Sequence, residues 1–220
     1  MTRRAAPLVL AATSGTGKTT LARRLVGDSD RFVFSISATT RPPRLGEENG
    51  VDYHFLSEED FERRAEAGDF AEWARVHGRS YGTLRSAIDG AADGGQHVVL
   101  DIDVQGARQI GEAIPDATLV FVLPPSVSTM MARLSGRGTE RRAEVARRLR
   151  SAIDELQAVP EFDYVVVNDD LEACLDEIRR IVENGVGPTG PSPDASAFRD
   201  EIGRILDSEY HDELNEQSQR

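Results

Sequence analysis

Residues 12–19 read Ala-Thr-Ser-Gly-Thr-Gly-Lys-Thr, and this stretch decides the fold. It matches the phosphate-loop pattern G-x-x-x-x-G-K-[ST] at every fixed position except the first, where alanine replaces glycine. Such a loop joins a buried strand to a helix, so that successive backbone N–H groups and the helix N-terminus surround a phosphate. The apolar run at 7–12 and the helical spacing at 21–26 provide that context. The stretch therefore predicts a site for nucleotide phosphates.

Each polar residue of this loop has an expected task. We expect Lys18 to reach the β- and γ-phosphates of ATP and the Thr19 hydroxyl to bind Mg²⁺. Lys18 is also the only lysine among the 26 lysine and arginine residues of the chain. Alanine at position 12 is costly only if that residue needs a positive φ. The residues expected to bind ATP in the loop are Ala12, Thr13, Ser14, Gly15, Thr16, Gly17, Lys18, Thr19 and Thr20.

A second buried strand is expected to bring a carboxylate close to the magnesium ion. The apolar run 98–100 ends at Asp101, and Asp103 follows two residues later on the same face of an extended chain. An acid in such a place is often a helix cap or a solvated residue. In open α/β sheets, however, ligands bind at the carboxyl ends of the strands, where Asp101 would lie. We expect Asp101 to contact Mg²⁺ through a water molecule.

Buried strands alternate with helices along most of the chain. Apolar runs at 98–102, 118–123 and 164–168 are typical of strands buried on both faces, as is the run at 7–12. Helical patterns fit the intervening segments 105–113, 126–134, 141–157 and 171–182. The alternation predicts an α/β fold, with a three-layer P-loop core in which helices cover both faces of a parallel sheet.

The remaining segments subdivide this core. Residues 35–85 are polar and turn-rich, and we interpret them as a small α+β substrate-binding subdomain inserted between core segments 1–34 and 86–185. A helix is expected to start at Ser57, where Asp60 completes a variant capping box. A glycine-hinged segment at 136–140 predicts a mobile helical lid over about residues 126–150.

The segment 186–220 has a different character, because a Pro/Gly-rich linker leads into an acidic amphipathic tail. An apolar stripe at helical spacing needs a surface to cover it. We expect the tail to dock on its own domain or on a second copy in a homo-oligomer, in preference to serving as a dedicated binding motif. The stripe consists of Phe198, Ile202, Ile205, Leu206 and Tyr210.

Composition narrows the possible partners. The net charge of −12 argues against a nucleic-acid-binding surface, which needs a basic face. No apolar run is long enough to span a membrane. The single cysteine, Cys174, excludes an intramolecular disulfide and a cysteine-based zinc site, which favours a reducing, cytoplasmic location.

Several further motifs occur in a specific order, and together they resemble the guanylate kinase family. They are Ser-Gly-Thr-Gly-Lys at 14–18, Ser-Ala-Thr-Thr-Arg-Pro-Pro-Arg at 37–44, Gly-Val-Asp-Tyr at 50–53, Glu-Trp at 72–73, Ser-Tyr-Gly-Thr at 80–83, Leu-Asp-Ile-Asp-Val-Gln-Gly at 100–106, Gly-Arg-Gly-Thr at 136–139 and Val-Asn-Asp-Asp at 167–170. The resemblance covers about residues 7–182. It implies direct transfer of the γ-phosphoryl group of MgATP to the small-molecule acceptor GMP, and also dGMP, giving ADP and GDP in purine nucleotide metabolism.

The resemblance also implies an acceptor site in the inserted subdomain. Arginine suits a phosphate dianion because its planar fork donates two parallel hydrogen bonds. An ionised Glu72 can accept from guanine N1–H and N2–H, whereas adenine offers the opposite pattern on that edge. Thr83 would donate to O6, and Asp103 would take the remaining N2 proton. The implied GMP-binding residues are Ser37, Arg41, Arg44, Tyr53, Glu72, Tyr81, Thr83 and Asp103.

Lid arginines complete the site that the resemblance implies. Arg137 and Arg148 resemble the arginines that close over the triphosphate in the family, whereas Arg141 and Arg142 are expected to lie on a solvated face. Asn168 is expected to contact adenine. The residues expected to act in catalysis are therefore Lys18, Arg41, Arg137 and Arg148.

Two other interpretations stay open from the sequence. A related P-loop kinase could act on a ribose bisphosphate, but it would not need the guanine-binding set around Glu72. A guanylate-kinase-like module could bind protein partners without catalysis, but such a module is expected to lose Lys18, Thr19 or the lid arginines, all of which this chain keeps.

Overall fold

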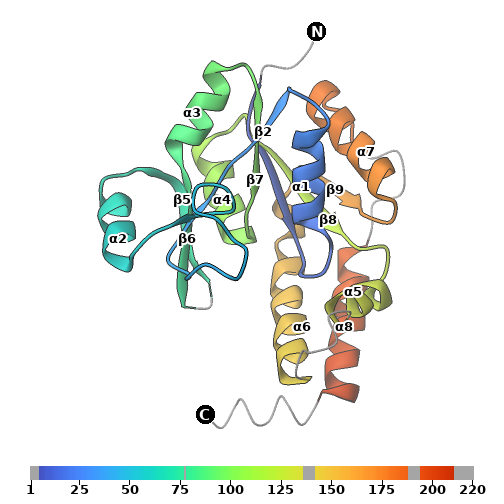
Figure 1. Ribbon diagram of the computed structural model, residues 1–220. Coiled ribbons are helices and arrows are strands. Elements are labelled where there is room, and N and C mark those ends of the chain that lie inside the picture. Colours follow the sequence, from blue (N-terminus) through green and yellow to red (C-terminus); the bar gives the residue numbers. More distant parts are fainter. Residues whose placement is uncertain (1–4, 77, 136–141, 188–193, 211–220) are drawn as a thin grey trace. The chain divides into compact units, whose positions relative to one another are not determined.

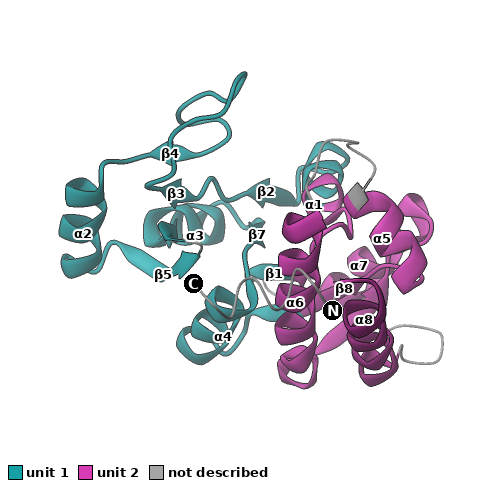
Figure 2. Cartoon of the chain, turned by 90° about the horizontal axis from the view of Figure 1, so that it is seen from below, with its two compact units in different colours: residues 1–10, 22–119 teal, residues 11–21, 120–220 magenta. Residues whose placement is uncertain are grey.

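The apolar run before the phosphate loop forms a strand, β1 (Leu8–Ala12), whose first residues are fully buried. The structure, a computed structural model, describes residues 5–76, 78–135, 142–187 and 194–210 (Figure 1). Its residues fall into two units, one of residues 1–10 and 22–119 and the other of residues 11–21 and 120–220 (Figure 2).

Parallel strands in the first unit lie in the order β2 (Phe32–Phe34), β7 (His97–Asp101) and β1. The N–H of Thr118 donates to the carbonyl of Pro7, which places the start of β8 beside β1. Two helices of this unit, α3 (Arg85–Asp93) and α4 (Val104–Ala113), precede and follow β7 in the chain. This part of the sheet therefore carries the carboxyl end of β7, with Asp101 as its last residue.

A second sheet in the same unit carries the expected acceptor site. Its strand order is β4 (His54–Phe55), β3 (Ala38–Thr39), β6 (Arg79–Leu84) and β5 (Phe70–Val76), with β5 and β6 antiparallel. Helix α2 (Glu58–Glu66) begins at the N-cap Ser57, whose hydroxyl accepts from the N–H of Asp60 as the sequence predicts. The rings of Phe61 and Phe70 stack with centroids 4.5 Å apart and form a small core beneath this sheet.

The second unit contains the loop residues, the pair of parallel strands β8 (Thr118–Leu123) and β9 (Tyr164–Val167), and helices on either side of them in the chain. Helix α1 (Lys18–Gly27) begins in this unit at Lys18. The other helices are α5 (Val127–Ser135), α6 (Arg142–Gln157), a short 3₁₀ helix (Val159–Glu161), α7 (Leu171–Asn184) and α8 (Ala195–Glu209).

Helix α8 lies in the tail, and it packs against α6 and α5 within the second unit. Its buried residues Ile202, Leu206 and Tyr210 belong to the apolar stripe that the sequence shows. The guanidinium of Arg142 in α6 lies 4.8 Å from the ring centroid of Tyr210 and donates to the carbonyl of Glu209. These three residues of the stripe are thus buried, whereas Phe198 and Ile205 are half-buried.

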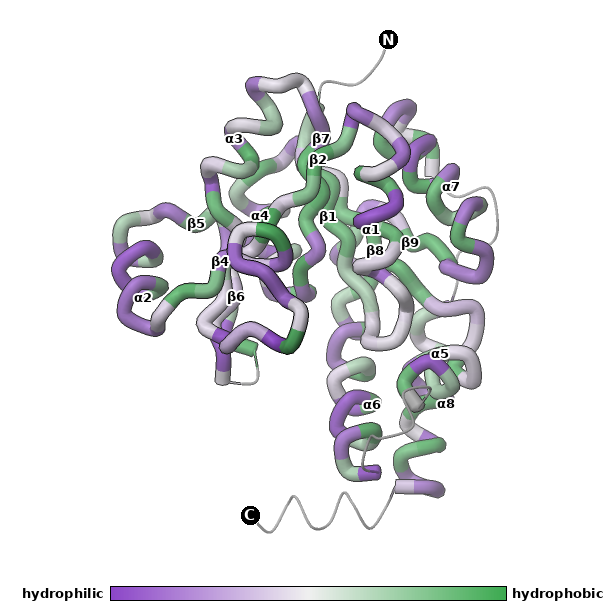
Figure 3. Tube along the Cα trace, in the orientation of Figure 1, coloured by the Kyte–Doolittle hydropathy of each residue, from purple (hydrophilic) through white to green (hydrophobic). Residues whose placement is uncertain are grey.

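The hydropathy of the chain explains which side chains each strand and helix buries. In Figure 3 hydrophobic residues run along β1, whereas α6 and α8 alternate hydrophobic and hydrophilic residues along their length. Strands covered on both faces bury every side chain, while helices that cover a face bury one stripe only. Strand β8 accordingly has six buried residues in succession.

The predicted α/β fold with a parallel central sheet is confirmed. The predicted strands and helices of the core agree with the structure to within two residues at each end, except that α1 begins three residues before the helical pattern at 21–26. The sequence interpretation did not identify β2 or α3, and it assigned no strands within residues 35–85. The short strands β3 and β4 have two residues each and carry no periodic signal. Within the described ranges, no helix combines the length and apolarity needed to cross a membrane.

Candidate active site

The phosphate loop turns tightly between β1 and α1. Gly15 and Gly17 have φ angles of 86° and 89°, a region that side chains with a Cβ rarely adopt. The Thr16 hydroxyl donates to the carbonyl of Thr13 at 2.7 Å, and this hydrogen bond stabilises the turn. Ala12, the residue that departs from the motif, is the last residue of strand β1, so its extended backbone accommodates alanine.

Side chains from α5, α6 and the end of β9 reach this loop within the second unit. Arg148 donates from Nη2 to the Ser14 hydroxyl at 2.6 Å, so one predicted lid arginine lies at the loop. Asn168 donates from Nδ2 to the Thr16 carbonyl at 2.7 Å, and Arg133 donates from Nη1 to the same carbonyl at 3.2 Å. Asn168 thus holds the loop in this structure, and its contact with adenine stays a prediction.

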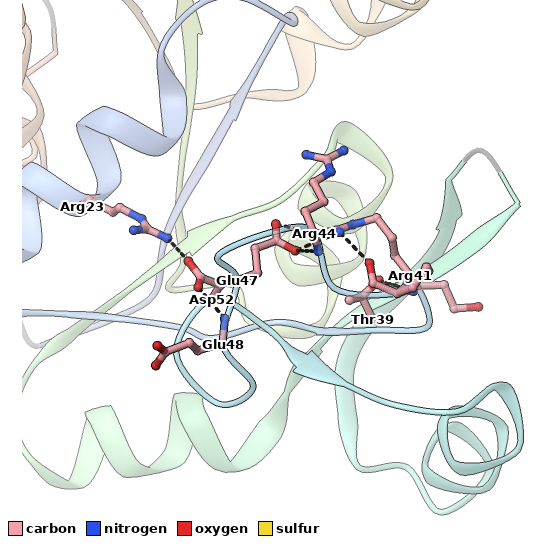
Figure 4. A network of polar contacts seen from close by, with 9 residues as sticks. Arg23, Thr39, Arg41, Arg44, Glu47, Glu48 and Asp52 are labelled. Carbon is pink, nitrogen blue, oxygen red and sulfur yellow. Dashed lines mark hydrogen bonds and ion pairs between the residues drawn. The ribbon is translucent and has the colours of Figure 1, made fainter.

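Some of the residues expected to bind the acceptor phosphate lie close together in the first unit, with Tyr53 beside Arg41 and Tyr81 beside Tyr53. Figure 4 shows the polar contacts of Arg41 and Arg44. The Arg41 guanidinium carbon lies 5.2 Å from the ring centroid of Tyr53, and the Tyr53 and Tyr81 rings meet edge to face at 6.2 Å. The guanidinium of Arg44 points away from Glu47 in Figure 4, and its residue is exposed. Ser37 is half-buried and accepts from the N–H of His54 through its carbonyl.

The expected guanine-binding residues also converge, through strand pairing. Glu72 on β5 and Thr83 on β6 are register partners, and the Thr83 hydroxyl donates to Glu72 Oε1 at 2.6 Å. A Thr83 hydroxyl that donates to guanine O6 must therefore first turn away from Glu72. Asp103 serves as the N-cap of α4, where its Oδ1 accepts from the N–H of Gly106 at 2.8 Å.

The Glu72 carboxylate is buried, with 4% of the residue exposed. Burial raises its pKa to about 7, the hydrogen bond from Thr83 opposes this, and the charge of Asp103 adds to the rise. Gly106 makes room for the carboxylate, because a Cβ at that position would lie 2.5 Å from Glu72 Oε2. A buried carboxylate with a raised pKa, beside hydroxyl and carboxylate neighbours, is suited to recognising a flat polar ligand.

The remaining predicted residues lie in different parts of the structure. Thr19 is exposed in the first turn of α1, and Asp101 is half-buried at the end of β7, where its charge contributes to raising the pKa of Tyr53 after the larger effect of burial. Arg137 lies outside the described residues. Arg142 contacts Tyr210 and the Glu209 carbonyl at the end of α8.

Sequence reasoning missed several residues that shape both sites. Glu47 holds Arg41, Gly106 admits Glu72, and Arg133 reaches the phosphate loop. Arg133 is one of many arginines with no distinguishing pattern. Glu47 stands six residues after Arg41 in an acidic loop, and charge complementarity was the one signal that could have indicated it.

Comparison with known proteins places these features in a family. The family model "Guanylate kinase" matches residues 4–185. A guanylate kinase from Nitratidesulfovibrio vulgaris is 52% identical over 172 residues, covering 78% of this chain and 83% of that protein. A guanylate kinase from Syntrophotalea carbinolica is 42% identical over 212 residues, covering 96% of this chain and 98% of that protein, so similarity continues into the tail.

A solved structure agrees with the sequence relatives. The crystal structure of guanylate kinase from Anaplasma phagocytophilum has a TM-score of 0.66 to this structure at 30% identity, covering 94% of this chain and 96% of that chain. The family model spans most of the chain, and the relatives are matched over most of their own length. The chain therefore belongs to the guanylate kinase family.

Proposed function

We propose that this protein transfers the γ-phosphoryl group of MgATP to GMP, and to dGMP, to form ADP and the guanosine diphosphate. Membership of the guanylate kinase family supports the reaction. The observation that carries the choice of acceptor is the buried Glu72 carboxylate, hydrogen-bonded to Thr83 across β5 and β6. An ionised carboxylate there accepts from guanine N1–H and N2–H and offers adenine no matching partner.

The donor half of the reaction uses the second unit. The loop N–H groups and the N-terminus of α1 bind phosphate oxygens, while Lys18 supplies positive charge at the β- and γ-phosphates. Arg148, held at Ser14, is near enough to the loop to add charge as the phosphoryl group leaves. Arg137 is proposed for the same task on the basis of its motif.

Mg²⁺ is the proposed cofactor. The residues that would hold it offer a hydroxyl, Thr19, and a carboxylate, Asp101, the hard oxygen donors that Mg²⁺ prefers, and Asp101 would act through water. When bound, the ion neutralises charge on the β- and γ-phosphate oxygens. The protein's own residues do the rest by binding and orienting the two nucleotides.

The acceptor half uses the first unit. Arg41 and Arg44 are proposed to bind the GMP phosphate, with the hydroxyls of Ser37, Tyr53 and Tyr81 as additional donors. Thr83 and Asp103 are proposed to complete guanine recognition beside Glu72. Phosphoryl transfer requires in-line positioning and charge stabilisation more than covalent assistance, so we propose direct transfer without a phospho-enzyme.

The cellular setting follows from the same reasoning. We place the protein in the cytoplasm, in purine nucleotide metabolism, with ATP and GMP as its small-molecule partners. The net charge of −12 disfavours nucleic acid as a partner. Docking of α8 on α6 gives the tail a role within its own chain, and a homo-oligomer stays a second proposal for the tail's exposed face.

An acceptor panel tests the proposal directly. ADP formation from MgATP would be measured with GMP, dGMP, AMP, UMP, CMP and a ribose bisphosphate. We expect kcat/KM for GMP to exceed that for AMP by about 10⁴-fold, because AMP leaves the buried carboxylate unpaired. Preference for AMP or for the ribose bisphosphate would reject the guanine assignment. Folded protein without turnover on any acceptor would favour a non-catalytic binding module.

A further inference from the structure

Arg41, the proposed ligand of the acceptor phosphate, is held by a carboxylate that no sequence motif indicated. Arg41 Nη1 and Nη2 donate to Glu47 Oε2 and Oε1 at 3.0 and 2.9 Å, in a bidentate ion pair (Figure 4). The pair is largely shielded from solvent, since the side chains of Arg41 and Glu47 are 14% and 19% exposed. Shielding and bidentate geometry make such a pair more persistent than an exposed surface pair.

The geometry of the guanidinium decides which donors remain for a ligand. Its five N–H groups lie in one plane. Nη1 also donates to the Pro42 carbonyl at 2.9 Å, so Pro42 and Glu47 together engage both Nη1 hydrogens and one on Nη2. The Nε–H and the other Nη2 hydrogen form the second edge of the plane, which covalent geometry directs away from Glu47. Glu47 is the main cause of the raised pKa of Arg41, and the Tyr81 side chain, another proposed phosphate ligand, also interacts with Arg41 and raises this pKa. Two parallel donors on one edge match two oxygens of a phosphate.

Glu47 is itself fixed in place. Its Oε2 also accepts from the backbone N–H of Arg44 at 2.7 Å, and its own N–H donates to the Arg44 carbonyl at 3.1 Å. The hydrogen bond from Arg41, and then that from Arg44, lower the pKa of Glu47, so that the carboxylate stays ionised near neutral pH. Arg41 is anchored at its other end, because its backbone N–H donates to the Thr39 hydroxyl on β3.

We propose that Glu47 is a positioning residue for the acceptor phosphate, which holds Arg41 so that its Nε/Nη2 edge faces the phosphate. The inference rests on the proposed role of Arg41 in binding GMP. A carboxylate in this place repels a phosphate dianion, so charge alone would weaken GMP binding. Orientation is the contribution that outweighs the repulsion, since an arginine free to rotate loses side-chain entropy on binding.

Glutamate-to-glutamine substitutions in one loop provide the test and its matched control. Glu47→Gln and Glu48→Gln remove the same charge one residue apart, but the Glu48 side chain points away from Arg41 (Figure 4). We expect Glu47→Gln to raise KM for GMP about tenfold and to leave KM for ATP within about twofold. Glu48→Gln should change both constants by less than about twofold.

Two further variants separate orientation from charge and from a general loss of structure. Glu47→Asp keeps the charge but shortens the reach, so we expect its KM for GMP to stay clearly above that of Glu48→Gln. In an Arg41→Ala background, Glu47→Gln should have less than about a twofold further effect, because the two residues act in series. Thermal unfolding of each variant checks that it is folded.

Specific outcomes would overturn the inference. A KM for GMP that is unchanged or lower in Glu47→Gln would mean that the carboxylate does not orient a phosphate ligand. An equal effect of Glu47→Gln with and without Arg41 would place its action elsewhere. An Arg41→Ala variant with an unchanged KM for GMP would refute the proposed role of Arg41 itself. That measurement does not depend on the Glu47 variants.

Discussion

Glu72 is almost completely buried, although the guanine-binding role proposed for it requires a negative charge. Its pKa is raised from the ordinary 4.5 of a glutamate to about 7, chiefly by burial. The folded state therefore favours the protonated carboxyl, and the resulting stability is full below pH 4.5 and is lost as the pH rises through about 7. Ionising this group for guanine thus costs folding free energy in the absence of ligand.

This shift leads to a pH prediction for the ligand-free protein. Between pH 6 and pH 8 the wild type is expected to lose about 1 kcal/mol of unfolding free energy relative to Glu72→Gln, because only the wild type must ionise a buried group. Urea unfolding of both proteins at the two pH values measures the difference. An identical pH dependence in the two proteins would show that Glu72 titrates normally.

The absence of a side chain at Gly106 leaves space for the Glu72 carboxylate. We expect Gly106→Ala to raise KM for GMP at least about tenfold with little change for ATP, since the new Cβ would displace the carboxylate. Gly90→Ala is the matched control, because that glycine is also helical in the first unit and a Cβ there meets no atom within 4 Å. Steady-state kinetics, with GMP and ATP varied in turn, gives KM for each substrate in both variants. Equal kinetics in both variants would contradict the close approach at Gly106.

Lys18 allows a test of the donor site without any change in charge. Lys18→Arg replaces a compact ammonium with a broad planar fork at the start of α1, where the loop turns tightly. We expect a folded protein whose kcat falls by about 100-fold or more. The coupled ADP assay measures kcat, and a thermal unfolding curve shows whether the variant is folded. Near-normal turnover would show that any cation at this position suffices.

At the scale of secondary structure elements, α8 extends the second unit beyond the region matched by the family model. It packs on α6, and α6 also carries Arg148, whose guanidinium reaches Ser14 in the phosphate loop. Helix α6 therefore contacts both the tail helix α8 and the phosphate loop. The similarity to the Syntrophotalea carbinolica protein over 96% of this chain shows that the tail is shared with at least that relative.

Truncating the stripe tests the contribution of α8. Ile202 is fully buried, so Ile202→Ala is expected to lower the unfolding free energy by about 2–4 kcal/mol. Because α6 would lose its packing partner, KM for ATP should rise more than KM for GMP. Asp207→Ala, on the exposed side of the same helix, should change stability by less than about 0.5 kcal/mol. Denaturant unfolding measures the loss of stability, and steady-state kinetics gives KM for each substrate. Equal effects of the two variants would show that the packing of α8 contributes little to either property.

At the scale of the whole molecule, the residues proposed to bind the two substrates belong to different units. The acceptor residues around Arg41 and Glu72 lie in the first unit, and the phosphate loop with Arg148 and Asn168 lies in the second. The strands β1 and β8 contribute residues to both units. Each nucleotide should therefore order its own unit first.

Hydrogen exchange tests this division. GMP alone is expected to slow amide exchange mainly within residues 37–83, and ADP alone mainly within residues 12–20, because ligands protect the segments that bind them. Mass spectrometry of peptides with each ligand, with both and with neither gives the comparison. Protection by GMP centred on residues 12–20 would contradict the assignment of substrates to units.

Local pattern was sufficient to predict the fold class and the conformation of the phosphate loop. The strand, loop and helix of the phosphate site are consecutive in the chain, and the glycines with positive φ at 15 and 17 are encoded by residue type alone. Long apolar runs likewise indicate strands buried on both faces. For these features, the sequence by itself determined the outcome, because residue type and local spacing specify them, whereas the hydrogen bonds from Arg133, Arg148 and Asn168 to the loop come from distant segments.

Tertiary structure decided the properties of the acceptor site. Glu72, Thr83 and Gly106 belong to β5, β6 and α4, and only their convergence buries the carboxylate and raises its pKa. The resemblance to a family indicated Glu72, but neither its protonation nor the bidentate hold of Glu47 on Arg41 could be predicted. Burial and hydrogen-bond geometry depend on which distant segments meet, and that information exists only once the chain has folded.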